Sequence, residues 1–141
     1  MLAELVKAGY GINEDLNCAE VVLSGANQVY HLGLDKEALK LAAGFGGGMA
    51  VEGTCGALTA AIMVLGKLYV QEKAHESTRI KELTKELLDR YQEGMGETDC
   101  APLKTKYRND EIKCRMVIFK AAEILDEIVA REDARAVGVE V

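Results

Sequence analysis

Residues 41–66 decide the fold, and they read LAAGFGGGMAVEGTCGALTAAIMVLG. The first half is a glycine-rich loop, and glycine permits backbone conformations and close approaches that a side chain would forbid. The second half carries a cysteine and then an almost wholly apolar run, and a helix that is apolar on all sides belongs inside a protein. With Thr54 as the predicted N-cap, Cys55 falls in the first turn of this helix. We therefore predict a central core helix over residues 55–71.

The same apolar run is too short to cross a membrane. A spanning helix needs about 20 consecutive apolar residues, and this run ends in Gln71, Glu72 and Lys73. We therefore predict a protein that does not span the membrane. The first residues show no basic leader before a long apolar stretch, so we predict no signal peptide and expect the protein to be cytoplasmic.

Composition favours an all-α fold in one domain, residues 1–141. This length is enough for one core, and a single proline leaves long stretches suited to helices. We expect a bundle of about five to six helices around the central one, with a charged tail that frays after about residue 130. The other expected helices cover residues 1–9, 18–30, 36–43, 76–93 and a last segment that begins after residue 109.

The charge of the chain argues against one class of partner. It has 17 lysines and arginines against 23 acidic residues, a net charge of -6. No basic stripe is apparent that could neutralise a row of phosphates, so we predict no nucleic-acid partner.

The four cysteines, Cys18, Cys55, Cys100 and Cys114, are isolated in the sequence and form no Cys-x-x-Cys pair. This spacing argues against thioredoxin-like and zinc-ribbon sites, which need two sulfurs from one turn. Cysteines of a cytoplasmic protein stay reduced by default, which favours metal binding or redox chemistry over a permanent disulfide framework.

Two of the cysteines fall at predicted helix N-termini. Cys18 follows Asn17, which forms a capping-box pattern with Glu20, and Cys55 begins the central helix. Unpaired backbone N–H groups and the helix dipole stabilise a thiolate at such positions. We predict Cys55 to be the most reactive thiol, because the glycine loop leaves room beside it.

The other two cysteines are placed differently. Cys100 is predicted in a loop that contains Pro102, and Cys114 in the second turn of a last helix capped by Asn109. Because helix starts joined by short loops can meet at one end of a bundle, we predict that all four sulfurs converge there. Four converging thiolates form the sulfur site used for zinc or for iron-sulfur clusters.

These residues resemble a family named for its C-GCAxxG-C-C cysteine pattern and for a presumption of redox activity. Asn17-Cys18-Ala19-Glu20 looks like its first motif, and residues 43–49 look like its glycine loop. Thr54-Cys55-Gly56-Ala57 is similar to its central motif, followed by the lone Cys100 and Cys114. The domain also resembles part of the split-Soret cytochromes, which implies an iron-sulfur centre on the four cysteines.

One position departs from the family pattern, because Ala60 stands where the family has glycine. A methyl group there implies slightly wider packing of the central helix and leaves the sulfur positions untouched. The family's association with transport loci implies a redox partner linked to a transport system. We also keep a homodimer open.

Three function classes remain open from the sequence. The first is a redox or electron-transfer protein that holds an iron-sulfur cluster or another thiolate-bound metal on Cys18, Cys55, Cys100 and Cys114. The second is a metal-free thiol-disulfide redox protein in which cysteine pairs cycle between dithiol and disulfide, with Cys55 as the attacking thiolate and Cys18 as the other candidate catalytic residue. The third is a helical interaction module with inert cysteines, since free cysteine is among the most buried residue types.

Overall fold

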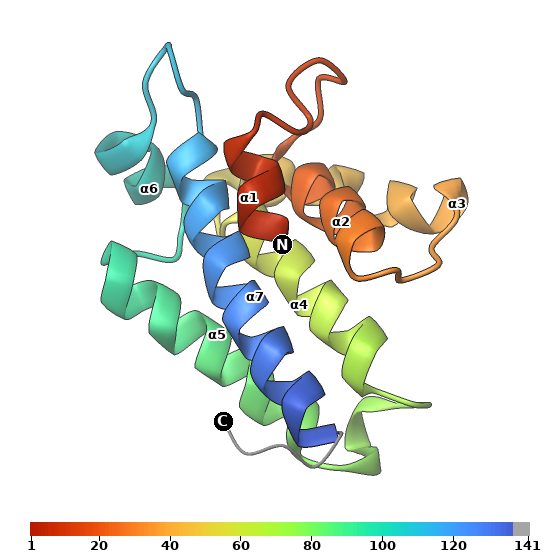
Figure 1. Ribbon diagram of the computed structural model, residues 1–141. Helices are drawn as coiled ribbons and strands as arrows, with labels where there is room; N and C mark the ends of the chain where they lie inside the picture. The colour runs from red at the N-terminus through yellow and green to blue at the C-terminus, as the bar shows by residue number, and fades with distance from the viewer. Residues whose placement is uncertain (137–141) are drawn as a thin grey trace.

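The structure is a computed structural model that describes residues 1–136, and Figure 1 shows it as a set of packed helices. Within these residues there are seven α-helices and no strand, which confirms the predicted all-α class. None of the described helices is long and apolar enough to cross a membrane. The helices are α1 (Leu2–Lys7), α2 (Cys18–Val29), α3 (Lys36–Leu39), α4 (Gly56–Tyr69), α5 (Arg79–Met95), α6 (Cys100–Tyr107) and α7 (Arg115–Ala136), joined in part by the short turns η1 (Lys40–Phe45), η2 (Gly48–Glu52) and η3 (Ala74–Glu76).

The core lies between α2, α4, α5 and α7. Figure 1 shows α4, α5 and α7 running alongside one another, and α2 packs against α4. Helix α4 contacts the other three, and Lys67 is its one exposed residue. Leu65 is fully buried, and so is Ala60, whose methyl group the core accommodates. Helices α2 and α7 bury long apolar faces as well. The core is therefore shared among several helices and is not built around α4 alone, although the apolar run of residues 55–71 predicts one central helix.

Two of the surrounding helices follow the predicted local rules. Asn17 and Glu20 form the capping box at the start of α2, in which each side chain accepts the backbone N–H of the other residue, at 2.9 and 3.0 Å. Helix α5 buries one face, as its two-faced sequence predicts. It ends at Gly96, which has a φ of 83°, and not at Gly94 as predicted, because only Gly96 adopts the left-handed helix-ending conformation.

Helix α7 holds α1 at both ends. The Asp126 carboxylate accepts the backbone N–H groups of Leu2 and Ala3, both at 2.9 Å, at the start of α1. One guanidinium nitrogen of Arg115, Nη1, donates to the carbonyls of Val6 and Tyr10 near the end of α1, at 3.3 and 3.1 Å. The orientation of Arg115 is therefore set by the backbone beside it.

The last helix extends further than the sequence suggested. A frayed tail was expected after about residue 130, but α7 continues to Ala136. Glu132, whose side chain is largely buried, pairs with Arg79 on α5 and with Arg131 and Arg135 on its own helix. These contacts tie the charged segment to the bundle. Residues 137–141 of the expected tail lie outside the described residues.

Candidate functional site

Each of the four cysteines stands at the start of a helix. Cys18 is the first residue of α2, as predicted. Cys55 is the N-cap of α4, and its carbonyl accepts the backbone N–H groups of Leu58 and Thr59. The predicted N-cap Thr54 is therefore wrong by one residue.

The positions of Cys100 and Cys114 correct the prediction. Cys100 is the first residue of α6 and not part of a loop, because Pro102 occupies the first turn, where its missing N–H costs nothing. Cys114 immediately precedes α7 and is not in its second turn, and its carbonyl accepts the N–H of Ile118 at 3.0 Å. Asn109 caps a turn instead, by accepting the N–H groups of residues 111 and 112.

Backbone pairing brings the second and third cysteines together. The N–H of Cys55 donates to the carbonyl of Thr98 at 2.9 Å, and the N–H of Cys100 donates to the carbonyl of Gly53 at 2.6 Å. Thr54 and Asp99 form an isolated antiparallel bridge between these two bonds. The starts of α4 and α6 are thus joined as one unit, although they are distant in the sequence.

Glycines allow the backbone to approach the cysteines closely. A Cβ on Gly56 would lie 2.7 Å from the Cys18 sulfur and 2.6 Å from the carbonyl oxygen of Phe45. A Cβ on Gly48 would lie 2.8 Å from the Cβ of Cys100 and 2.5 Å from the carbonyl oxygen of Gly53. Real Cβ atoms do not come this close, so both positions require glycine for the packing of the site.

The loop between η1 and α4 contains an unusual left-handed turn. Gly47, Gly48, Met49 and Ala50 have φ values of 65°, 62°, 61° and 64° in succession. For a residue with a Cβ this conformation costs roughly 1–2 kcal/mol. The turn therefore stores strain at Met49 and Ala50, directly beside the cysteines, where strained backbone often serves function.

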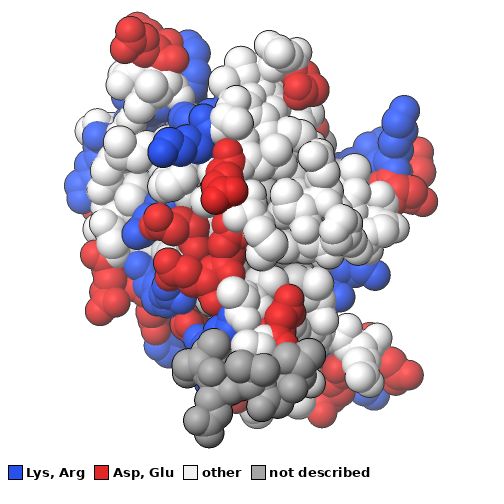
Figure 2. All heavy atoms as spheres, in the orientation of Figure 1, with Lys and Arg blue, Asp and Glu red and all other residues white. Residues whose placement is uncertain are grey.

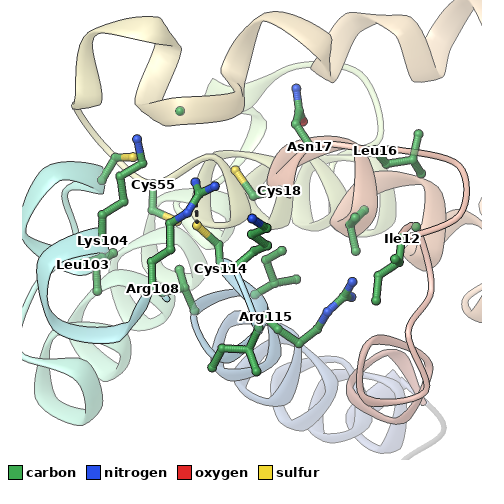
Figure 3. Close-up of a pocket in the computed structure, with 18 of the residues that line it drawn as sticks. Ile12, Leu16, Asn17, Cys18, Cys55, Leu103, Lys104, Arg108, Cys114 and Arg115 are labelled. Carbon is green, nitrogen blue, oxygen red and sulfur yellow. Dashed lines mark hydrogen bonds between the residues drawn. The ribbon is translucent and has the colours of Figure 1, made fainter. Parts of the chain in front are cut away.

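All four cysteines are free thiols and line one cavity of about 690 Å³. Figure 3 shows Cys18, Cys55 and Cys114 facing this space from α2, α4 and the start of α7. Cys55 and Cys100 are 4% and 8% exposed, whereas Cys18 and Cys114 are half-buried. No three His, Cys, Asp or Glu side chains of the described residues are close enough together to hold a metal ion.

The electrostatics of Cys18 and Cys55 are opposite. A hydrogen bond from the Cys55 thiol lowers the pKa of Cys18 to about 6, helped by the backbone N–H groups of Gly47, Ala19 and Gly56. Donation of that bond to Cys18, together with burial, raises the pKa of Cys55. This environment favours Cys18 as the thiolate and Cys55 as the protonated partner, the reverse of the role that the sequence predicts for Cys55.

The remaining two cysteines lie beside basic side chains. Burial raises the pKa of Cys100, against the lowering effect of Lys104. Arg108 donates from Nη1 to the Cys114 sulfur at 3.8 Å, which Figure 3 marks with a dashed line. These basic residues are not among the predicted site residues, although the sequence shows a local cluster of lysine and arginine between Cys100 and Cys114.

The fold and the site define an all-α protein with four helix-start cysteines around one cavity. The chain belongs to the family described as "Putative redox-active protein (C_GCAxxG_C_C)", which it matches over residues 16–128. This confirms the resemblance drawn from the cysteine motifs, and the description names redox activity as the class of function. No curated protein and no solved structure matches the chain.

Proposed function

We propose that this protein transfers electrons through an iron-sulfur cluster held by Cys18, Cys55, Cys100 and Cys114, with a separate redox partner as donor or acceptor. The observation that carries the proposal is that all four cysteines line one cavity, each from the start of a different helix. Iron-sulfur clusters are held by four cysteine thiolates, and when bound they supply one-electron chemistry. The four thiolates that line the cavity would hold the cluster, whereas no three His, Cys, Asp or Glu side chains of residues 1–136 lie close enough together for a single metal ion.

The residues around the cysteines suit such a group. Backbone N–H groups at a helix start favour negative charge, and four helix starts supply them around this cavity. Cys55 and Cys100 are buried, which keeps water from two of the four sulfurs. Arg108 and Lys104 place positive charge beside Cys114 and Cys100 and so offset the charge of the thiolates.

Anaerobic purification, or reconstitution with iron and sulfide, tests the proposal. We expect sulfur-to-iron charge-transfer absorption, and iron and acid-labile sulfide in equal amounts. Each single Cys→Ser variant of the four should lose most of this absorption, because one thiolate ligand is removed.

The matched control is Ser24→Ala, a substitution on α2 outside the cavity, which should keep the full absorption. A colourless protein after anaerobic reconstitution, or Cys→Ser variants that all retain the cluster, would refute the assignment of these ligands.

A second candidate function is metal-free thiol-disulfide exchange, which the Cys18–Cys55 hydrogen bond favours. The Cys18 thiolate would attack a substrate disulfide and release one thiolate, forming a mixed disulfide. Cys55 would then lose its proton and attack the Cys18 sulfur, which releases the second thiolate. The protein pair is oxidised by two electrons, and the substrate is reduced to two thiols.

Alkylation of the metal-free, reduced protein distinguishes the two thiols. Iodoacetamide should modify Cys18 before Cys55, with a pH profile whose midpoint lies near the Cys18 pKa of about 6. Below that pH the thiolate is protonated, so the rate should fall about tenfold per pH unit. Peptide mapping by mass spectrometry measures both rates, and faster modification of Cys55 at pH 6 would reverse the assigned roles.

A further inference from the structure

Two arginines differ from the others because they have no acidic ion-pair partner among the described residues. The chain has six arginines, and four of them form ion pairs with glutamates on α5 and α7. Arg108 and Arg115 have no carboxylate within 4 Å among residues 1–136, and both line the cysteine cavity. The four paired residues are Arg79, Arg90, Arg131 and Arg135.

The ion-paired region and the cavity differ in how their charges are paired. Figure 2 shows blue and red atoms intermixed over α5 and the lower part of α7, where the ion pairs lie. At the cavity, Lys7 and Lys113 also lack a carboxylate within 4 Å among the described residues. Two acidic residues, Asp15 and Glu111, also line the cavity, but neither lies within 4 Å of these four basic side chains. A protein with a net charge of -6 thus leaves four basic side chains without an ion-pair partner around one concave site. Such a site attracts an anion.

The guanidinium of Arg115 is held in an orientation that can bind an anion. The bonds of its Nη1 to the carbonyls of Val6 and Tyr10 fix the guanidinium. Its Nε and Nη2 make no hydrogen bond to any of residues 1–136. These two nitrogens form the edge that binds a carboxylate through two parallel hydrogen bonds.

The surroundings of Arg115 indicate that the anion has an apolar part. Figure 3 shows Arg108 reaching toward Cys114, while Arg115 lies on the side of the cavity formed by Ile12 and Leu16. Ile12 is 61% exposed at this side, and Ile112, which also lines the cavity, is 40% exposed. A cavity of about 690 Å³ is in the size range of small-molecule sites. Exposed isoleucines beside a fixed guanidinium suit an aliphatic carboxylate.

We propose that the side of the cavity formed by Ile12, Leu16 and Arg115 binds a small organic anion. Its carboxylate pairs with the free edge of Arg115, and Lys7 and Lys113 add positive charge. Its aliphatic part covers Ile12 and Leu16. This inference concerns binding, so it goes beyond the proposed electron transfer and does not depend on whether the cysteines hold a cluster.

Titration calorimetry with hexanoate, using the reduced, metal-free full-length chain, tests the inference. Hexanoate should bind at least about tenfold tighter than its neutral analogue hexanamide, because one charge-assisted pair provides the difference. Arg115→Gln should abolish that difference. Arg135→Gln, a matched change in the ion-paired region, should leave it intact.

A second variant separates binding from folding, because Arg115 also holds α1. Ile12 is exposed, so Ile12→Ser should keep the fold and still weaken hexanoate several-fold without affecting acetate. Equal binding of hexanoate and hexanamide, equal binding of sulfate and hexanoate, or an unchanged affinity in both variants would overturn the proposal. Failure of the electron-transfer proposal would instead appear as missing iron with hexanoate binding intact.

Discussion

A Gly48→Ala variant should lose about 2–5 kcal/mol of unfolding free energy. Two effects add. The left-handed conformation at Gly48, with φ of 62°, costs roughly 1–2 kcal/mol for alanine. The new methyl group would lie 2.5 Å from the Gly53 carbonyl oxygen and 2.8 Å from the Cβ of Cys100, and such overpacking costs about 1–3 kcal/mol.

The matched control is Gly47→Ala, one residue earlier. Gly47 has nearly the same φ, 65°, but a Cβ there would meet nothing within 4 Å. We expect it to lose only about 1–2 kcal/mol. Urea denaturation followed by circular dichroism measures both values. Equal losses of unfolding free energy in the two variants would mean that the close approach of Gly48 to Cys100 does not affect stability.

A Gly56→Ala variant should disturb the site as well as the fold. The added methyl group would lie 2.7 Å from the Cys18 sulfur and 2.6 Å from the Phe45 carbonyl oxygen. The sulfur can rotate away, but the backbone carbonyl cannot, so we expect a loss of about 1–3 kcal/mol. A displaced Cys18 sulfur also loses its hydrogen bonds from Cys55 and from the Gly56 N–H. The midpoint of Cys18 alkylation should therefore move above pH 6.

Gly66→Ala is the control within the same helix. A Cβ on Gly66 meets nothing within 4 Å, and alanine favours a helix interior by roughly 0.5–1 kcal/mol over glycine. This variant should be slightly more stable and keep the alkylation profile of the parent protein. If Gly56→Ala also keeps that profile, then the backbone around Gly56 does not hold the Cys18 thiolate.

The helices that follow strong local rules could be predicted from the sequence. Asn17 and Glu20 are three residues apart and define the start of α2 without any tertiary information. The two-faced pattern of α5 is equally local. The all-α class follows from such patterns repeated along the chain.

The positions of two cysteines could not be predicted by the same reasoning. Pro102 favours a loop when the sequence is taken alone, but proline is also common in the first turn of a helix, and Asp99 before Cys100 is a helix-start signal. Near Cys114, Asn109 caps a turn that ends at Lys113, which has a φ of 53°. Nothing in the local sequence distinguishes that turn from the first turn of a helix.

The chemistry of the site depends on contacts that no local pattern contains. Cys18 and Cys55 both stand at helix starts, so the sequence alone could not say which one carries the charge. The backbone N–H groups of Gly47, Ala19 and Gly56 favour the thiolate at Cys18, and their approach to its sulfur depends on tertiary packing. The left-handed conformation of Met49 and Ala50 could not be predicted from the sequence either, because these residue types rarely adopt it.

The pairing of the α4 and α6 starts has a consequence for biosynthesis. Cys55 is held through Thr98, and Cys100 through Gly53, so neither position is fixed until both segments have been made. Cys114 arrives later still on the growing chain. Until then Cys18 and Cys55 have no closed cavity around them, and closing such long loops is the slow part of assembly. A cofactor held by all four cysteines would therefore complete its ligand set only after residue 114 has been made.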